Sequence, residues 1–240
     1  MTNVYFIRHG QAGTRDAYDS LSELGRRQAR MLGRYFVSQP VEFAAAYAGN
    51  LRRQQQTAAE VSAAYREAGR AFPELSIETG WDEFDFHHVY EELAPLICED
   101  DPEFRSEHEA LREQVAASAH EAEVHRRWRA SDTKVVEAWA AGRYPYGGES
   151  WEQFVGRVSA CRLQDGGGAP RPNVIVFTSA TPAAVWASKA LGISDGRIRR
   201  LAGVLENTSY TLLQLRGEEL LLLSFNSVPH LPSPDLRTRR

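Results

Sequence analysis

Short apolar segments, each followed by a turn and a helical pattern, constrain the fold of this chain most. Residues 3–7 (NVYFI) and 173–178 (NVIVFT) are rich in β-branched and aromatic side chains and end at turn-forming residues, as buried strands do. Further strand patterns cover residues 43–48 and 75–79, with helical patterns between them. This alternation favours an α/β fold with a mostly parallel sheet.

The helical patterns carry start signals of their own. Ser20 followed by Glu23 fits a capping box ahead of the first helix. The remaining elements follow in chain order: helices at residues 51–68, 149–163 and 182–191, and a closing hairpin formed by residues 209–215 and 219–225.

The middle of the chain, about residues 82–142, is highly charged and mostly helical in pattern, and we expect Pro95 and Pro102 to divide it into pieces. Because strand patterns resume afterwards, we interpret it as a helical insertion within a single domain of residues 1–240. The polar, proline-containing end of the chain, about residues 232–240, is expected to fray.

Composition limits the classes of function. The net charge is −4 and no basic stripe is present, which argues against a nucleic-acid partner. No apolar run approaches the roughly 20 residues that a membrane helix needs. Cys98 and Cys161 form neither a zinc nor a disulfide pattern, and no signal peptide precedes the first strand pattern. We therefore expect a cytoplasmic protein.

The basic residues are nearly all of one kind. Because 26 of the 28 basic residues are arginines, guanidinium groups would do any anion binding, and their geometry suits phosphate.

The first strand pattern ends in Arg8-His9-Gly10, and ligands of α/β sheets bind beyond the carboxyl ends of strands. A neutral imidazole beside a guanidinium can attack phosphorus. Arg8 can neutralise phosphate oxygens, and Gly10 allows a close approach of the backbone. A histidine that is hydrogen-bonded into the fold explains the triplet equally well, so the triplet alone leaves both possibilities open.

Other stretches accompany this triplet in a defined order across almost the whole chain. They are Phe6-Ile-Arg-His-Gly10, Asp19-Ser-Leu-Ser-Glu-Leu-Gly-Arg-Arg-Gln-Ala29, Leu51-Arg-Arg-Gln-Gln-Gln-Thr-Ala58, Gly147-Gly-Glu-Ser150, and Glu206-Asn-Thr-Ser209 leading to Phe225-Asn226 and His230-Leu231. With this ordered set the chain resembles the histidine phosphatase superfamily, the phosphoglycerate mutase-like proteins. The resemblance implies a three-layer α/β/α domain with a helical insertion over the active site.

The resemblance also implies a metal-independent phosphatase, without a cofactor, that acts on a small phosphorylated molecule. In this family a histidine attacks a phosphate monoester, and water then hydrolyses the phosphohistidine. His9 matches that histidine. Arg8 and Arg53 match the two arginines that hold the phosphoryl group, whose charge such groups neutralise. For Arg53, a solvated position on a helix is the alternative.

A leaving alkoxide needs a proton, and the family supplies it from a carboxylic acid shortly after the third strand. Glu83 in Trp81-Asp-Glu-Phe-Asp-Phe86 is our choice, although the family's usual glycine is absent there. Its pKa would have to be raised by partial burial. Asp82, Asp85 and a plain surface role for Glu83 are the alternatives.

The chain departs from the family at the end of the late strand, where Ser179 replaces the second active-site histidine. Losing one such donor costs about 10²–10³ in rate. Ser179 and Thr178 with nearby N–H groups at the helix start can bind phosphate in its place, since helix N-termini attract anions. We favour this explanation because the other four positions remain. Alternatively His87 or His88 completes the site, although we interpret both as an exposed pair on a loop, or the protein binds a phosphorylated ligand or partner with little or no turnover.

Two further interpretations concern specificity. His125-Arg-Arg-Trp-Arg129 is either an anion patch or, as we favour, a solvated helix face. A phosphoglycerate mutase is less consistent with the chain, because residues 11–18 do not resemble that activity's substrate-contact segment. The substrate would be set by the insertion, and nothing in the sequence points to an oligomeric state.

Overall fold

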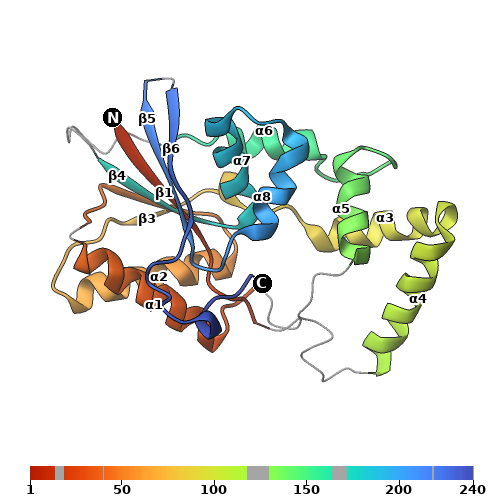
Figure 1. Cartoon of the computed structure of the whole chain (residues 1–240), viewed down its shortest axis with the longest axis horizontal. Coiled ribbons are helices and arrows are strands. Elements are labelled where there is room, and N and C mark those ends of the chain that lie inside the picture. The colour runs from red at the N-terminus through yellow and green to blue at the C-terminus, as the bar shows by residue number, and fades with distance from the viewer. Residues whose placement is uncertain (14–18, 40, 118–129, 164–171, 218, 240) are drawn as a thin grey trace. The chain divides into compact units, whose positions relative to one another are not determined.

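The computed structural model describes residues 1–240 except 14–18, 40, 118–129, 164–171, 218 and 240 (Figure 1). The chain forms two compact units. Unit 1 comprises Met1–Glu83 and Val158–Arg240, and unit 2 comprises Phe84–Arg157. All candidate site residues of the preceding section, namely Arg8, His9, Arg53, Glu83 and Ser179, belong to unit 1.

Among the described residues, unit 1 contains a six-stranded sheet with the order β3-β2-β4-β1-β5-β6. Strands β1 to β4 run parallel, whereas β5 is antiparallel to both β1 and β6. The predicted α/β fold with a mostly parallel sheet and a closing hairpin is therefore confirmed. The strands are β1 (Thr2–Arg8), β2 (Ala45–Ala48), β3 (Leu75–Ile77), β4 (Asn173–Thr178), β5 (Tyr210–Arg216) and β6 (Glu219–Ser227).

Helices cover both faces of this sheet. Successive side chains of a strand point to opposite faces, so neighbouring residues of one strand pack against different helices. Ile7 and Phe177 belong to the buried cluster that α1 and α2 share with the sheet. Phe6 points the other way and stacks on Trp186 of α7, with 5.5 Å between ring centroids. This is the three-layer arrangement that the resemblance implies. The helices of unit 1 are α1 (Glu23–Ser38), α2 (Arg52–Glu67), α7 (Ala180–Leu191) and α8 (Ile198–Val204).

The first helix begins later than the capping-box pattern predicts. Its N-cap is Ser22, whose hydroxyl accepts a hydrogen bond from the Gly25 N–H at 3.0 Å. Ser20 does not cap the helix, because its neighbour Leu21 forms an antiparallel bridge with Ala12. The Ser20 prediction is therefore wrong. A tertiary pairing keeps the chain extended for two more residues.

The described residues of unit 2 lie mostly in helices, as the pattern of residues 82–142 predicts, and the unit continues beyond that range to Arg157. Pro102 begins α4, and the Asp101 carboxylate before it accepts the Phe104 N–H at 2.9 Å, a typical N-terminal arrangement. Pro95 lies inside α3, so the prediction that it divides the segment is wrong. The helices are α3 (Phe86–Asp100), α4 (Pro102–Ala117), α5 (Ala130–Ala140) and α6 (Trp151–Ser159), whose last two residues lie in unit 1.

Residues 232–239, for which the sequence predicts fraying, lie against the core of unit 1 instead. The fully buried Gln28 side chain donates a hydrogen bond to Thr238 Oγ1 at 2.9 Å. Thr238 Oγ1 donates in turn to Asn207 Oδ1 at 2.9 Å, and Asn207 Nδ2 donates to the His9 carbonyl at 3.1 Å. This chain of hydrogen bonds connects the C-terminal segment to the end of β1.

Replacing Thr238 with valine is expected to destabilise unit 1 by about 1–3 kcal/mol, because buried partners of the hydroxyl would lose their hydrogen bonds. Urea unfolding measures this change. The matched control is Thr238→Ser, which keeps the hydroxyl and should stay close to the wild type. Equal stability of the valine and serine variants would show that the tail does not depend on this hydroxyl.

Candidate active site

The candidate nucleophile and the serine that replaces the second histidine follow neighbouring parallel strands. In the β1–β4 register Arg8 is opposite Thr178, and the His9 N–H donates to the Thr178 carbonyl at 2.9 Å. His9 and Ser179 therefore emerge side by side at the carboxyl edge of the sheet. This edge is where open α/β sheets bind their ligands.

The hydrogen bonds of His9 define its tautomer. Its Nδ1 lies 2.8 Å from the Gly10 carbonyl, which can only accept, so Nδ1 carries the proton. Its Nε2 accepts a hydrogen bond from Arg53 Nε at 3.1 Å. Burial, followed by the charges of Arg53 and Arg8, holds the pKa of His9 well below its ordinary value. The ring is thus neutral, with a lone pair on Nε2, which is the form that a nucleophile requires.

Arg53 is held by groups that the sequence analysis did not single out. Its Nη1 lies 3.1 Å from Asp19 Oδ1, and Asp19 Oδ2 accepts the Arg52 N–H at 3.2 Å. Asp19 thus places negative charge at the N-terminus of α2, a favourable position, and orients the guanidinium. Thr57 Oγ1 accepts the Gly10 N–H at 3.0 Å and donates to the Arg53 carbonyl at 2.7 Å. Asp19 and Thr57 both lie in the motif stretches quoted above, and this was the signal by which the sequence could have identified them as site residues.

The Arg8 guanidinium binds the main chain of the C-terminal part of unit 1. It donates to the Leu205 carbonyl and, at 2.6 Å, to the Arg239 carbonyl. The side chain is buried, and its charge contributes to the low pKa of His9. The phosphate-binding role of Arg8 stays a prediction. Each of these nitrogens carries two N–H groups, so the contact to a carbonyl does not by itself prevent a second contact to a phosphate oxygen.

The three carboxylates considered as acids have different partners. Glu83 Oε2 accepts the Thr181 N–H in the first turn of α7 at 3.1 Å. Asp82 Oδ1 accepts the Asn50 N–H at 2.6 Å, and Asp85 caps α3. Since α7 starts directly after Ser179, Glu83 lies at the same helix N-terminus as the candidate phosphate-binding serine. This geometry favours Glu83 over its two neighbours.

The remaining predictions concern the insertion. His87 and His88 are exposed on the first turn of α3, where they approach Glu91 and Glu92 at 3.0 and 3.5 Å. The prediction that both are exposed is confirmed, but the prediction of a loop is wrong, because Asp85 caps α3 just before them and accepts the His88 N–H. The His125–Arg129 stretch lies outside the described residues.

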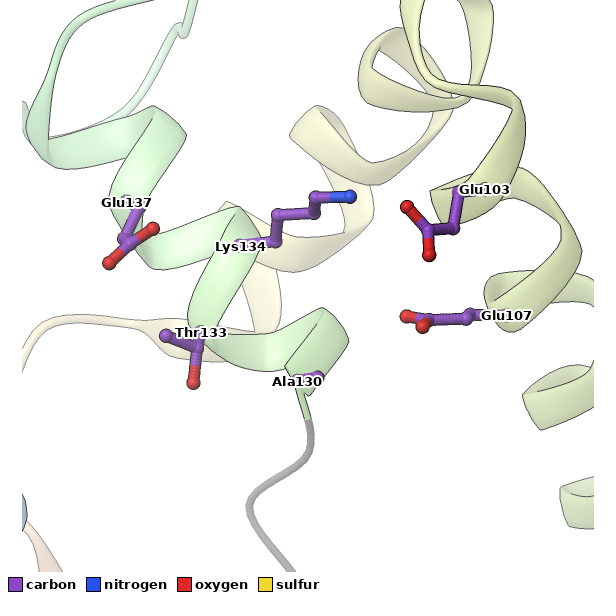
Figure 2. A pocket seen from close by; sticks show the side chains of 6 residues that line it. All are labelled: Glu103, Glu107, Ala130, Thr133, Lys134 and Glu137. Atoms are coloured by element: carbon purple, nitrogen blue, oxygen red, sulfur yellow. The ribbon is translucent and has the colours of Figure 1, made fainter.

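A pocket of about 420 Å³ lies within unit 2 between α4 and α5 (Figure 2). Lys134 points from α5 toward α4 there, but its Nζ is paired with Asp101 Oδ2 at 2.6 Å. The other charges are carboxylates, which repel phosphate. We therefore assign the pocket no phosphate-binding role. Its lining residues are Glu103, Glu107, Ala130, Thr133, Lys134 and Glu137.

Within the described ranges, no group of three or more His, Cys, Asp or Glu side chains is placed to hold a metal ion. None of the helices in the described part of the chain is both long and apolar enough to cross a membrane.

Comparison with known protein families identifies the class of protein. Residues 4–137 and 106–228 match the model of the histidine phosphatase superfamily, branch 1. The chain therefore belongs to this superfamily, as its ordered motifs predict. No curated protein matches the chain.

Several solved structures share the fold, and some of them carry the name of a phosphatase. Bacillus stearothermophilus YhfR is 18% identical, with a TM-score of 0.62, and the match covers 96% of this chain and 100% of that one. A putative alpha-ribazole-5'-P phosphatase from Escherichia coli is 18% identical, with a TM-score of 0.60 over 95% and 98%. A phosphoserine phosphatase mutant from Entamoeba histolytica, in complex with phosphoserine, is 17% identical, with a TM-score of 0.51 over 96% and 100%. At sequence identities of 17–18%, the similarity to these structures shows a shared fold and nothing about the substrate.

Proposed function

We propose that this protein is a metal-independent phosphatase that hydrolyses a small phosphate monoester through a phosphohistidine on His9. The observation that carries the proposal is the neutral His9 ring at the carboxyl edge of the sheet. Its Nε2 atom carries a lone pair and lies 3.1 Å from Arg53 Nε. Membership of the histidine phosphatase superfamily supports it. The phosphoserine bound to one structural neighbour supports a small phosphorylated substrate.

The proposed reaction has two steps. His9 Nε2 attacks phosphorus while the bond to the leaving oxygen breaks, and Glu83 in its protonated form gives that oxygen a proton. Arg53 releases the Nε2 lone pair before this attack and donates to a phosphoryl oxygen instead, and with Arg8 it matches the charge of the transferring group. In the second step a water molecule, activated by the Glu83 carboxylate, attacks the phosphohistidine. Phosphate leaves, the His9 lone pair is restored, and Glu83 regains its proton.

Mass spectrometry of the reacting enzyme tests this proposal. We expect a phosphoryl group on the peptide that contains His9 when a reaction with p-nitrophenyl phosphate is stopped in alkali, in which phosphohistidine persists. The signal should disappear after an acid stop, because phosphohistidine is acid-labile. Release of phosphate with the phosphoryl group on another residue, or on none, would contradict the proposed intermediate.

One observation favours a second candidate function, a phospho-ligand-binding protein with little or no turnover. Ser179 replaces the second active-site histidine, and a serine hydroxyl is shorter and carries no charge. Calorimetry with phosphate, run beside an assay of phosphate release from a panel of phosphorylated metabolites, separates the two. Binding without release would favour this candidate. Transfer between positions of a sugar acid would instead favour a mutase.

A further inference from the structure

The two hydrogen bonds of the Gln54 amide nitrogen, to Ser179 and to Trp81, have a definite direction. Gln54 Nε2 lies 2.9 Å from Ser179 Oγ and 3.2 Å from the Trp81 carbonyl. Because a carbonyl can only accept, the amide nitrogen of Gln54 must face these two groups, which settles the assignment of its amide. Ser179 Oγ is therefore the acceptor from Gln54, and its own proton is not used in this contact.

Ser179 also does not use its side chain as helix N-caps usually do. A serine at this position typically accepts the N–H of the second or third helical residue. Here Ser179 makes no such bond, although it is the N-cap of α7, and the N–H of Thr181 is bonded to Glu83 Oε2 instead. Within the described part of the chain, the Ser179 hydroxyl proton has no recorded acceptor. Glu83 thus accepts the N–H that the Ser179 oxygen would otherwise accept as an N-cap.

The buried amide of Gln54 is satisfied on its nitrogen but not on its oxygen. Its side chain is fully buried, and among the described residues its Oε1 has no hydrogen-bond partner, an arrangement that costs stability. Room for Oε1 exists because residue 49 is glycine: a Cβ there would lie 2.1 Å from Gln54 Oε1 and 2.4 Å from Asp82 Oδ1. A buried amide that is kept without full satisfaction calls for another explanation.

We propose that Gln54 is a positioning residue for phosphoryl transfer. It holds Ser179 Oγ as an acceptor, so that the serine proton points to a phosphoryl oxygen, and the pair supplies the donor that a second histidine would otherwise supply. The inference rests on the proposed function. The first turn of α2 sets both halves of the site, because Arg53 contacts His9 and the next residue contacts Ser179.

A double-mutant cycle on Ser179→Ala and Gln54→Leu tests the coupling. We expect Ser179→Ala to lower kcat by about 10²-fold, with a smaller loss for Gln54→Leu. The double variant should be no slower than Ser179→Ala, because Gln54 acts through the serine. Losses that multiply would overturn the proposal. The control is Gln55→Leu, which changes the next glutamine of α2, bonded to the Asn50 carbonyl, and should keep the wild-type kcat.

A second variant keeps the size of the side chain. In Gln54→Glu the carboxylate can only accept, so it would draw the Ser179 proton toward itself. We expect a loss of kcat at least as large as in Gln54→Leu, with KM changed less than kcat. Urea unfolding shows which variants are folded. Wild-type kcat in a folded Gln54→Glu protein would overturn the proposal.

Vanadate affinity separates this inference from the proposed function. Calorimetry with vanadate, which mimics a transferring phosphoryl group, is run on the four proteins of the cycle. If the wild type releases no phosphate but the cycle shows non-additive losses of vanadate affinity, the phosphatase proposal fails and the role of Gln54 stands. Additive losses overturn the role of Gln54 whether or not the protein is a phosphatase. If the wild type neither binds vanadate nor releases phosphate, both fail.

Discussion

Replacing His9 with alanine is expected to lower kcat for p-nitrophenyl phosphate on the order of 10⁴-fold or more, because the variant has no nucleophile and no covalent route. Arg53 loses the Nε2 lone pair that it contacts in the wild type, but it keeps its ion pair with Asp19. Vanadate binding should therefore persist. A steady-state assay with calorimetry on the same preparation measures both properties.

The control for this prediction is His88→Ala. His88 is an exposed histidine of α3, and its removal should leave kcat unchanged. A large loss in His88→Ala would favour the alternative in which a histidine of the insertion completes the site. Equal rates for the wild type and His9→Ala would remove His9 from the mechanism altogether.

Lowering the pH is expected to destabilise the protein through His230. Thr208 Oγ1 donates its proton to the Asn207 carbonyl at 2.7 Å, so it accepts from His230 Nε2 at 2.9 Å. The proton of the ring is therefore on Nε2. Among the described residues, the buried His230 Nδ1 has no partner that would stabilise a second proton. Burial accordingly lowers the pKa of His230 to about 3.

The sign of the effect follows from proton binding. Between the unfolded pKa of about 6.5 and the folded pKa of about 3, the unfolded chain binds more protons, so the free energy of unfolding falls as the pH is lowered through this window. At about 1.4 kcal/mol for each pKa unit, the loss is about 2 kcal/mol at about pH 5. It reaches about 5 kcal/mol below the folded pKa.

Urea unfolding of wild type and His230→Gln between about pH 7 and about pH 5 measures this contribution. Glutamine can donate to Thr208 but does not titrate, so the variant should lose about 2 kcal/mol less than the wild type over this range. Some slope should remain, because burial also lowers the pKa of His9. The exposed His88→Gln is the matched control. Parallel curves for wild type and His230→Gln would contradict the prediction.

The strands were predicted well where the sequence is nearly continuous in apolar residues. The strand at residues 173–178 matches β4, and the closing hairpin matches β5 and β6 to within two residues. Boundaries that depend on distant partners were not predictable. The bridge between Ala12 and Leu21 delays α1, and α3 continues through Pro95.

The sequence by itself determined the family, the parallel sheet and the placement of His9 and Ser179 at strand ends, because these depend on local patterns and on the order of motifs. Only the tertiary structure decided the tautomer of His9, the pairing of Arg53 with Asp19 and the contact of Gln54 with Ser179. Arg53 and Asp19 are 34 residues apart in the sequence, and Gln54 and Ser179 are 125 residues apart. Their hydrogen bonds depend on which strands become neighbours and where α2 begins. No local pattern encodes that geometry, because the same residues at the same spacings would be solvated side chains in another fold.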